Sequence, residues 1–323
     1  MRTTRWAVAV STMLVAALVA ACSGAVSQPA TSNPQGIVAE VASYQLVADQ
    51  PGRLLIALIS GDNRWLSFGT VTASFEYLGD GRGTAAPGVS ADPQTAHFLA
   101  IPGSPEQADS PPVLTLPADG RGLYTVEPVT FPRAGYWQVI ASGQPRDGPS
   151  FEASAAFTVL DRPMVTAVGA PALHTENPVI GTPGVALAAI DSRAAGGAAI
   201  PDPELHATSI AQALDQGHPA LIVFSTPVYC VSRFCGPVTD LVADLASVYG
   251  DRADFIHIEI YRDFQAGLVN QAALDWLQTD AGELREPWTF FIDADGLIAG
   301  SWDTVVARSE LEPILQALPV KGR

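Results

Sequence analysis

The sequence predicts two folded domains, an all-β sandwich followed by an α/β domain. Between residues 37 and 160, short strand-like runs are separated by Gly, Pro and Asp, and no long helical period occurs. Between residues 205 and 320, helical and strand periods alternate instead. Two domains also suit the length, because 323 residues exceed the usual size of one hydrophobic core.

The chain begins with the pattern of an export signal. Arg2 and Arg5 precede the apolar run 6–21, which is short for a membrane span of about 20 apolar residues. Residues 1–21 are therefore predicted to be a signal peptide, and the folded part is expected outside the cytoplasm.

Cys22 follows the signal directly. The residues Val19-Ala20-Ala21-Cys22 resemble the lipobox of bacterial lipoproteins. This resemblance implies that Cys22 is acylated, becomes the mature N-terminus and anchors the protein to the cell membrane. The alternative is an ordinary signal peptide with a chance cysteine. Residues 22–36 are small and polar, which predicts a flexible tether.

The first predicted domain, residues 37–160, consists of short strands. The run 53–60 is compact and apolar, and further strands are predicted at 122–131, 135–143 and 151–160. The segment 70–78 alternates, so one face of its pleat carries Val71, Ala73, Phe75 and Tyr77.

The stretch 132-PRAGYWQV-139 resembles a strand of the immunoglobulin-like domains found on exported bacterial proteins. The resemblance implies an immunoglobulin-like sandwich. We interpret Trp137 and Tyr136 as core and corner residues, because burying a large aromatic side chain removes much apolar surface from water. Residues 161–204, rich in Pro, Gly and Ala, are predicted to be an extended connector along a surface or between domains.

The second predicted domain alternates helices and strands. Thr208 or Ser209 caps a helix over 209–216, and Gly217 ends it. Apolar runs and amphipathic periods then predict strands at 219–225, 254–261, 288–293 and 297–302, with helices at 237–249, 264–278 and 308–318.

This order of elements, with two cysteines between the first strand and its helix, resembles the thioredoxin fold over residues 205–320. The motifs that carry the resemblance are 219-PALIVFSTPVYC-230, Cys235-Gly236-Pro237 and the hairpin 286-EPWTFFIDADGLIAGSW-302. It implies a cis Pro287 lying against a redox-active cysteine pair. The whole chain is similar to exported bacterial lipoproteins that carry a sandwich ahead of a thioredoxin-like domain.

The cysteine spacing departs from the family pattern, because four residues separate Cys230 from Cys235 where the family has two. Two alignments remain open. Cys235 takes the place of the second cysteine after a loop insertion, or it takes the place of the first and Val238 replaces the second. The strand residues 220–225 also lack the carboxylate that many members place there.

The chemistry of the pair follows from its place in the chain. Outside the cytoplasm a disulfide between Cys230 and Cys235 is stable, and a helix start favours the thiolate that exchange requires. Gly236 and Pro237 suit the first helical turn, and Arg233 is expected to add positive charge. Cys230 is predicted to attack a substrate disulfide and Cys235 to resolve the intermediate, with the reverse order left open.

The predicted function is a membrane-anchored thiol-disulfide oxidoreductase or redox-linked module that acts on thiols or disulfides of exported proteins. The main alternative is a binding module with an inert structural disulfide. A copper-handling protein that uses His257 and a peroxidase that uses the region of Thr226 and Pro227 are weaker alternatives.

Other partners and ligands are not predicted. A net charge of −16 argues against nucleic-acid binding, because phosphate backbones repel an acidic chain. No cofactor or metal is expected, since His174, His206 and His218 are interpreted as solvated loop residues and His257 as an ordinary strand residue. The oligomeric state is left open.

Overall fold

The computed structural model describes residues 33–81, 90–107 and 109–321. The described residues form one compact unit. The predicted signal peptide, Cys22 and most of the predicted tether lie outside the described residues. No helix in the described part is long and apolar enough to cross a membrane.

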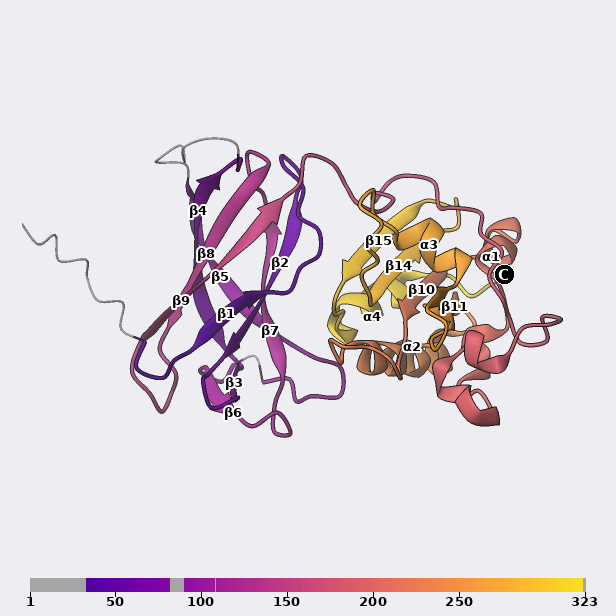
Figure 1. Cartoon of the computed structure of the whole chain (residues 1–323), viewed down its shortest axis with the longest axis horizontal. Coiled ribbons are helices and arrows are strands. Elements are labelled where there is room, and N and C mark those ends of the chain that lie inside the picture. Colours follow the sequence, from indigo (N-terminus) through magenta and orange to yellow (C-terminus); the bar gives the residue numbers. More distant parts are fainter. Residues whose placement is uncertain (1–32, 82–89, 108, 322–323) are drawn as a thin grey trace, which may run out of the picture. The chain divides into compact units, whose positions relative to one another are not determined.

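The first half of the chain forms a nine-stranded antiparallel sheet with the order β6-β3-β2-β7-β5-β4-β8-β9, and β1 pairs with β2 (Figure 1). Its strands are β1 (Val38–Val41), β2 (Gly52–Ile59), β3 (Trp65–Ser67), β4 (Thr70–Gly79), β5 (Ser90–Ala100), β6 (Val113–Thr115), β7 (Gly122–Val129), β8 (Gly135–Gly143) and β9 (Phe151–Val159).

The core of this sheet follows the strand alternation. The predicted face of β4 is buried, since Val71, Ala73, Phe75 and Tyr77 are all part of the core. Trp137 is fully buried at its centre, as predicted. Tyr136 is 50% exposed, because successive strand residues point to opposite faces of the sheet, and its interpretation as a corner residue stays a prediction.

The second half contains a four-stranded mixed sheet with the order β11-β10-β14-β15. The strand β10 (Ala220–Ser225) is parallel to β11 (Asp254–Glu259) and antiparallel to β14 (Trp288–Ile292), which pairs antiparallel with β15 (Ile298–Asp303). A small hairpin joins β12 (Tyr261–Asp263) to β13 (Leu268–Val269).

Apolar helix faces cover both sides of the mixed sheet. The helices are α1 (Ile210–Asp215), α2 (Cys235–Tyr249), α3 (Gln271–Leu277) and α4 (Arg308–Ala317). Leu221 and Val223 of β10 share a core with α2 and α4, whereas Ile222 and Phe224 share one with α1 and α3. The alternation of β10 therefore separates two hydrophobic layers.

The segment between the two sheets packs against the mixed sheet. Gly169 N donates to Ile298 O at 2.8 Å, and Ala172 N donates to Gly296 O at 2.9 Å. Three short 3-10 helices follow, η1 (Leu187–Ala189), η2 (Ser192–Gly197) and η3 (Pro203–His206). Ile190 and Asp191 between them are buried, so this segment brings polar side chains into the interior.

The predicted fold class, an immunoglobulin-like sandwich followed by a thioredoxin-like α/β fold, was wrong. The structure is mostly β: of the described residues, 35% lie in strands and 18% in helices, and the main feature is the large antiparallel sheet. Strand alternation predicts individual strands but not how they pair, and here the first-half strands hydrogen-bond into one sheet.

The helical part is smaller than predicted. The expected helix 264–278 is a hairpin strand, β13, followed by the seven-residue α3. Gly267 adopts a φ of 66° between β12 and β13, a left-handed conformation that a helix interior does not contain. Short helices on a small mixed sheet do not support the predicted α/β fold.

Candidate functional site

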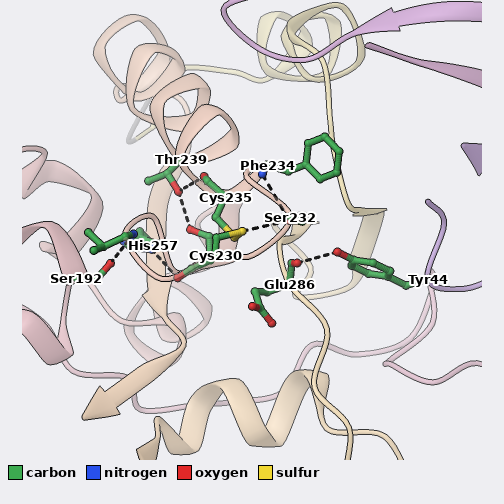
Figure 2. Close-up of a disulfide and its surroundings, with 11 residues drawn as sticks. Tyr44, Ser192, Cys230, Ser232, Phe234, Cys235, Thr239, His257 and Glu286 are labelled. Atoms are coloured by element: carbon green, nitrogen blue, oxygen red, sulfur yellow. Dashed lines mark hydrogen bonds between the residues drawn. A yellow bond between two sulfur atoms is a disulfide. The ribbon is translucent and has the colours of Figure 1, made fainter. Parts of the chain in front are cut away.

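A disulfide joins Cys230 and Cys235 (Figure 2). Their Cα atoms are 6.0 Å apart, which lies within the usual range for a disulfide. The bond closes the loop between β10 and α2, so the pairing of these two cysteines that the sequence predicts is confirmed.

The two cysteines differ in exposure. Cys235 is fully buried as the first residue of α2, whereas Cys230 is half-buried on the loop before it. Sγ of Cys230 lies 3.1 Å from the hydroxyl oxygen of Ser232, in an exposed position. An external thiol therefore has a more open approach to Cys230 than to Cys235.

Helix α2 begins two residues earlier than predicted, at Cys235. Leu241 and Leu245 anchor its apolar face in the core. Phe234 precedes the helix and offers no side-chain cap, so the first backbone N–H groups of α2 lack the partner that a capping residue supplies. These N–H groups favour negative charge at Cys235.

Hydroxyl groups fix the start of α2 against the sheet. Thr239 Oγ1 donates to the carbonyl oxygen of Cys235 at 2.8 Å, and Ser225 Oγ lies 2.6 Å from Thr239 Oγ1. All three residues are buried. The end of β10 and the first turn of α2 are thereby joined directly beneath the disulfide.

Backbone contacts hold the cysteine loop. Cys230 N donates to Thr226 O at 3.1 Å, and Val228 N donates to Ser192 Oγ at 3.2 Å. The second contact ties the loop to the first residue of η2. The position of Cys230 therefore depends on residues far away in the sequence.

Pro287 is buried immediately before β14, and the peptide bond between Glu286 and Pro287 is cis. Tyr44 Oη donates to the carbonyl oxygen of Glu286 at 2.7 Å. Figure 2 includes Glu286 and Tyr44 among the surroundings of the disulfide. The structure therefore brings the segment before Pro287 to the cysteine pair.

Glu286 is a functional candidate that the sequence did not predict. Burial, together with the smaller effect of the negative charge of Glu259, raises the pKa of its carboxyl group to about 7. Glu259 is itself buried at the end of β11, opposite Ser225. Residues 220–225 contain no acid, and both carboxylates come from other segments: Glu259 ends β11 and Glu286 precedes β14.

The predicted supporting residues surround the helix start. Gly236 and Pro237 lie in the first turn of α2, where the missing N–H of Pro237 leaves no broken helical bond. Arg233 is exposed with a φ of 64°. Within the described part of the chain, it makes no hydrogen bond or ion pair with either cysteine, so its electrostatic role stays a prediction.

Apolar side chains are exposed around the loop. Val228 is 53% and Val231 93% exposed. Nearby, the ring of Tyr229 stacks on that of Phe264, with centroids 3.9 Å apart. Exposed apolar groups that lie together are typical of surfaces that contact other proteins.

No family model matches this chain, and no curated protein sequence matches it either.

Proposed function

We propose that this protein is a thiol-disulfide oxidoreductase that uses Cys230 and Cys235 on exported proteins. The observation that carries the proposal is the asymmetry of the disulfide. Cys230 is half-buried on a loop, and Cys235 is fully buried at a helix start that stabilises a thiolate. Disulfide exchange requires one sulfur that an external thiolate can reach, here Cys230, and a second sulfur that leaves as a stabilised thiolate, here Cys235.

The exchange proceeds in two steps. A thiolate of the partner protein attacks Sγ of Cys230 and forms a mixed disulfide, while the electron pair of the broken bond leaves with Sγ of Cys235. A second thiolate of the partner then attacks the partner's own sulfur in the mixed disulfide and releases Cys230 as a thiolate. The partner loses two electrons and gains a disulfide, and the cysteine pair gains those electrons. The reverse sequence with a protein disulfide restores the original state.

The small loop between the cysteines supports exchange over a purely structural role. Only four residues separate Cys230 from Cys235. A disulfide stabilises a fold mainly by restricting the unfolded chain, and this restriction grows with the length of the closed loop. The bond therefore contributes less to stability than a long-range disulfide would.

The exposed apolar residues support a polypeptide substrate. Val228, Val231 and the Tyr229–Phe264 stack border the loop that carries Cys230. Unfolded polypeptides present apolar side chains next to their cysteines, and such side chains bury area against this surface. Folded proteins expose fewer apolar side chains next to their cysteines.

We further propose that Cys22 carries lipid and anchors the protein outside the cytoplasm. The residues before Cys22 support this, and an oxidising compartment suits a bonded cysteine pair. Mass spectrometry of the N-terminal peptide is expected to show acylated Cys22. The Cys22→Ser variant is expected to leave the membrane fraction, and an unmodified Cys22 would contradict the anchor without affecting the redox proposal.

The redox proposal is tested by equilibrating the protein with glutathione buffers. We expect a reduction potential above about −300 mV, since structural disulfides usually lie below this value. The Cys235→Ser variant is expected to trap mixed disulfides through Cys230, and Cys230→Ser is the matched control that traps fewer. A potential in the structural range together with no trapped partner would identify an inert disulfide in a binding module.

A further inference from the structure

A second polar cluster lies inside the protein, built from Asp191, His206 and His257. The three residues are 0%, 1% and 2% exposed. Asp191 precedes η2, His206 ends η3 and His257 lies in the middle of β11. Three separate segments therefore converge on one buried point, and the dithiol chemistry uses none of these side chains.

The spacing of the three side chains fits a tetrahedral metal ion. Asp191 Oδ2 lies 3.3 Å from His206 Nε2 and 3.7 Å from His257 Nδ1. All three ligand atoms lie within 4.8 Å of one another. Zinc bound by nitrogen and oxygen at about 2.0–2.1 Å places neighbouring tetrahedral ligands about 3.3 Å apart. Little movement is needed to bring the three atoms around one ion.

His257 directs an unused lone pair at this point. Its Nε2 lies 3.1 Å from Ser225 O, and because a carbonyl oxygen only accepts, Nε2 carries the proton. Nδ1 is then an acceptor, and this buried atom has no hydrogen-bond partner in the described structure. A buried polar atom without a partner is costly, and a metal ion would satisfy it.

The hydrogen bond from His257 to Ser225 O is also the support that metal-binding histidines usually have. Such histidines donate their other ring N–H to a carbonyl or carboxylate, which fixes the tautomer and the orientation of the ring. Here the acceptor is the last residue of β10, a rigid strand. The direction of Nδ1 is therefore set before any ion binds.

Asp191 is oriented in the same way by Arg193. Arg193 Nη2 donates to Asp191 Oδ2 at 2.7 Å, and Nε donates to Oδ1 at 3.0 Å. The positive charge of Arg193 is offset in turn by Asp202 at 2.7 Å and by Asp240 at 3.4 Å. These two acids leave the surroundings negative enough to accept a cation.

We infer that Asp191, His206 and His257 form a binding site for one divalent transition-metal ion, with Zn²⁺ as the best-fitting ion. Two imidazole nitrogens and one carboxylate oxygen suit zinc and its first-row neighbours better than Mg²⁺ or Ca²⁺. His206 offers Nε2, the ring nitrogen that lies 3.3 Å from Asp191 Oδ2.

The metal site is separate from the cysteine pair but mechanically connected to it. Ser192, next to Asp191, accepts the hydrogen bond from Val228 N in the cysteine loop. Figure 2 includes Ser192 and His257 among the surroundings of the disulfide. A bound ion holds η2 and β11 together and thereby stabilises the loop that carries Cys230.

The test is Zn²⁺ titration of the full chain in its oxidised form, followed by calorimetry. The disulfide removes both thiols of the pair as ligands, and a Cys22→Ser background removes the third. We expect one Zn²⁺ per chain and at least tenfold weaker binding by His206→Gln and by His257→Gln. The matched control His218→Gln alters a half-buried histidine paired with Asp254 and is expected to bind as the parent does.

A second measurement does not depend on the variants folding. Long-range ¹H–¹⁵N spectra of the parent protein report the five histidine rings separately. Stoichiometric Zn²⁺ is expected to shift the ring signals of His206 and His257 and to leave those of His97, His174 and His218 in place. No Zn²⁺ uptake, or uptake with the signals of His206 and His257 unmoved, would overturn the inference and leave the cluster as a buried hydrogen-bond network.

Discussion

Glu286 is a half-buried acid among the surroundings of the disulfide in Figure 2. Burial and the nearby charge of Glu259 raise its pKa to about 7. Near neutral pH, the carboxyl group is therefore divided between its neutral and its charged form. A negative charge that develops beside the dithiol disfavours a thiolate there, because like charges repel more strongly away from bulk water.

We expect Glu286→Gln to make the reduced cysteine pair more reactive above pH 7. In the parent protein Glu286 is charged in this range and opposes formation of the thiolate; the amide removes that charge. Alkylation by iodoacetamide, followed from pH 5 to pH 9, is expected to be a few-fold faster in the variant at pH 8 and similar at pH 5. Glu283→Gln, an exposed acid paired with Arg285, is the control. Identical pH profiles for Glu286→Gln and the parent would show that Glu286 does not act on the pair.

At the scale of elements, the contact between β10 and α2 positions the disulfide. Ser225 ends β10, and Thr239 lies one turn into α2. Their hydroxyls are 2.6 Å apart, and Thr239 also donates to Cys235 O. The strand end and the helix start are thus joined by a buried chain of hydrogen bonds. A buried hydroxyl that loses its partner in such a chain destabilises the fold.

Thr239→Val is expected to lower the free energy of unfolding by about 1–3 kcal/mol, because it leaves the buried hydroxyl of Ser225 without its partner while keeping the side-chain volume. Urea unfolding followed by circular dichroism measures this change. The double variant Ser225→Ala with Thr239→Val is expected to recover part of the loss, since both hydroxyls are then gone. A double variant that is less stable by the full sum of the two single effects would argue against the direct contact.

At the scale of the whole molecule, buried ionic contacts connect residues of β2 and its preceding loop with β15 and α4. Arg53 of β2 forms an ion pair with Glu310 at 3.1 Å and donates to Val305 O at 2.8 Å. The carboxylate of Asp303 accepts from the backbone N–H groups of Tyr44 and Gln45. Burial raises the pKa of Asp303 to about 6, although the nearby charge of Arg53 lowers it.

This raised pKa makes stability depend on pH. The folded state holds the proton of Asp303 more tightly than the unfolded chain does. Protonation of Asp303 therefore contributes fully to the stability of the folded state below pH 4, and this contribution is lost as pH rises to about 6. The free energy of unfolding of the parent is expected to fall on the order of 1–3 kcal/mol more than that of Asp303→Asn between pH 4 and pH 7. The amide oxygen can still accept from Tyr44 N and Gln45 N. Denaturant unfolding at several pH values checks this, with the exposed Asp295→Asn as control, and equal pH dependence in Asp303→Asn and the parent would contradict it.

Several features of the fold and the site were predictable from local sequence. The alternation of residues 70–78, the buried Trp137 and the helix after Cys235 follow from periods of two and 3.6 residues. The cysteine pair was predictable because a five-residue separation lets the two Cα atoms come within bonding range. Such features depend on neighbours in the chain.

The interpretation of His206 as a solvated residue was wrong, because its burial depends on segments that are distant in the sequence. It lies among loop residues with no periodic pattern, and yet it is buried with Asp191 and His257. Asp191 gave no local signal either, since it lies in a Pro- and Gly-rich segment. A loop residue's burial depends on what packs over it, and that information is not contained in its neighbours.

The chain's own pattern of apolar, turn and cysteine residues is sufficient to predict individual strands, the main helix and the disulfide, because these depend on interactions over a few residues. Only the tertiary structure determines that the first strands form one antiparallel sheet, that Glu286 lies beside the disulfide, and that Asp191, His206 and His257 meet. These arrangements depend on contacts between segments distant in sequence, which form because the chain gains free energy by burying its apolar surface as a whole.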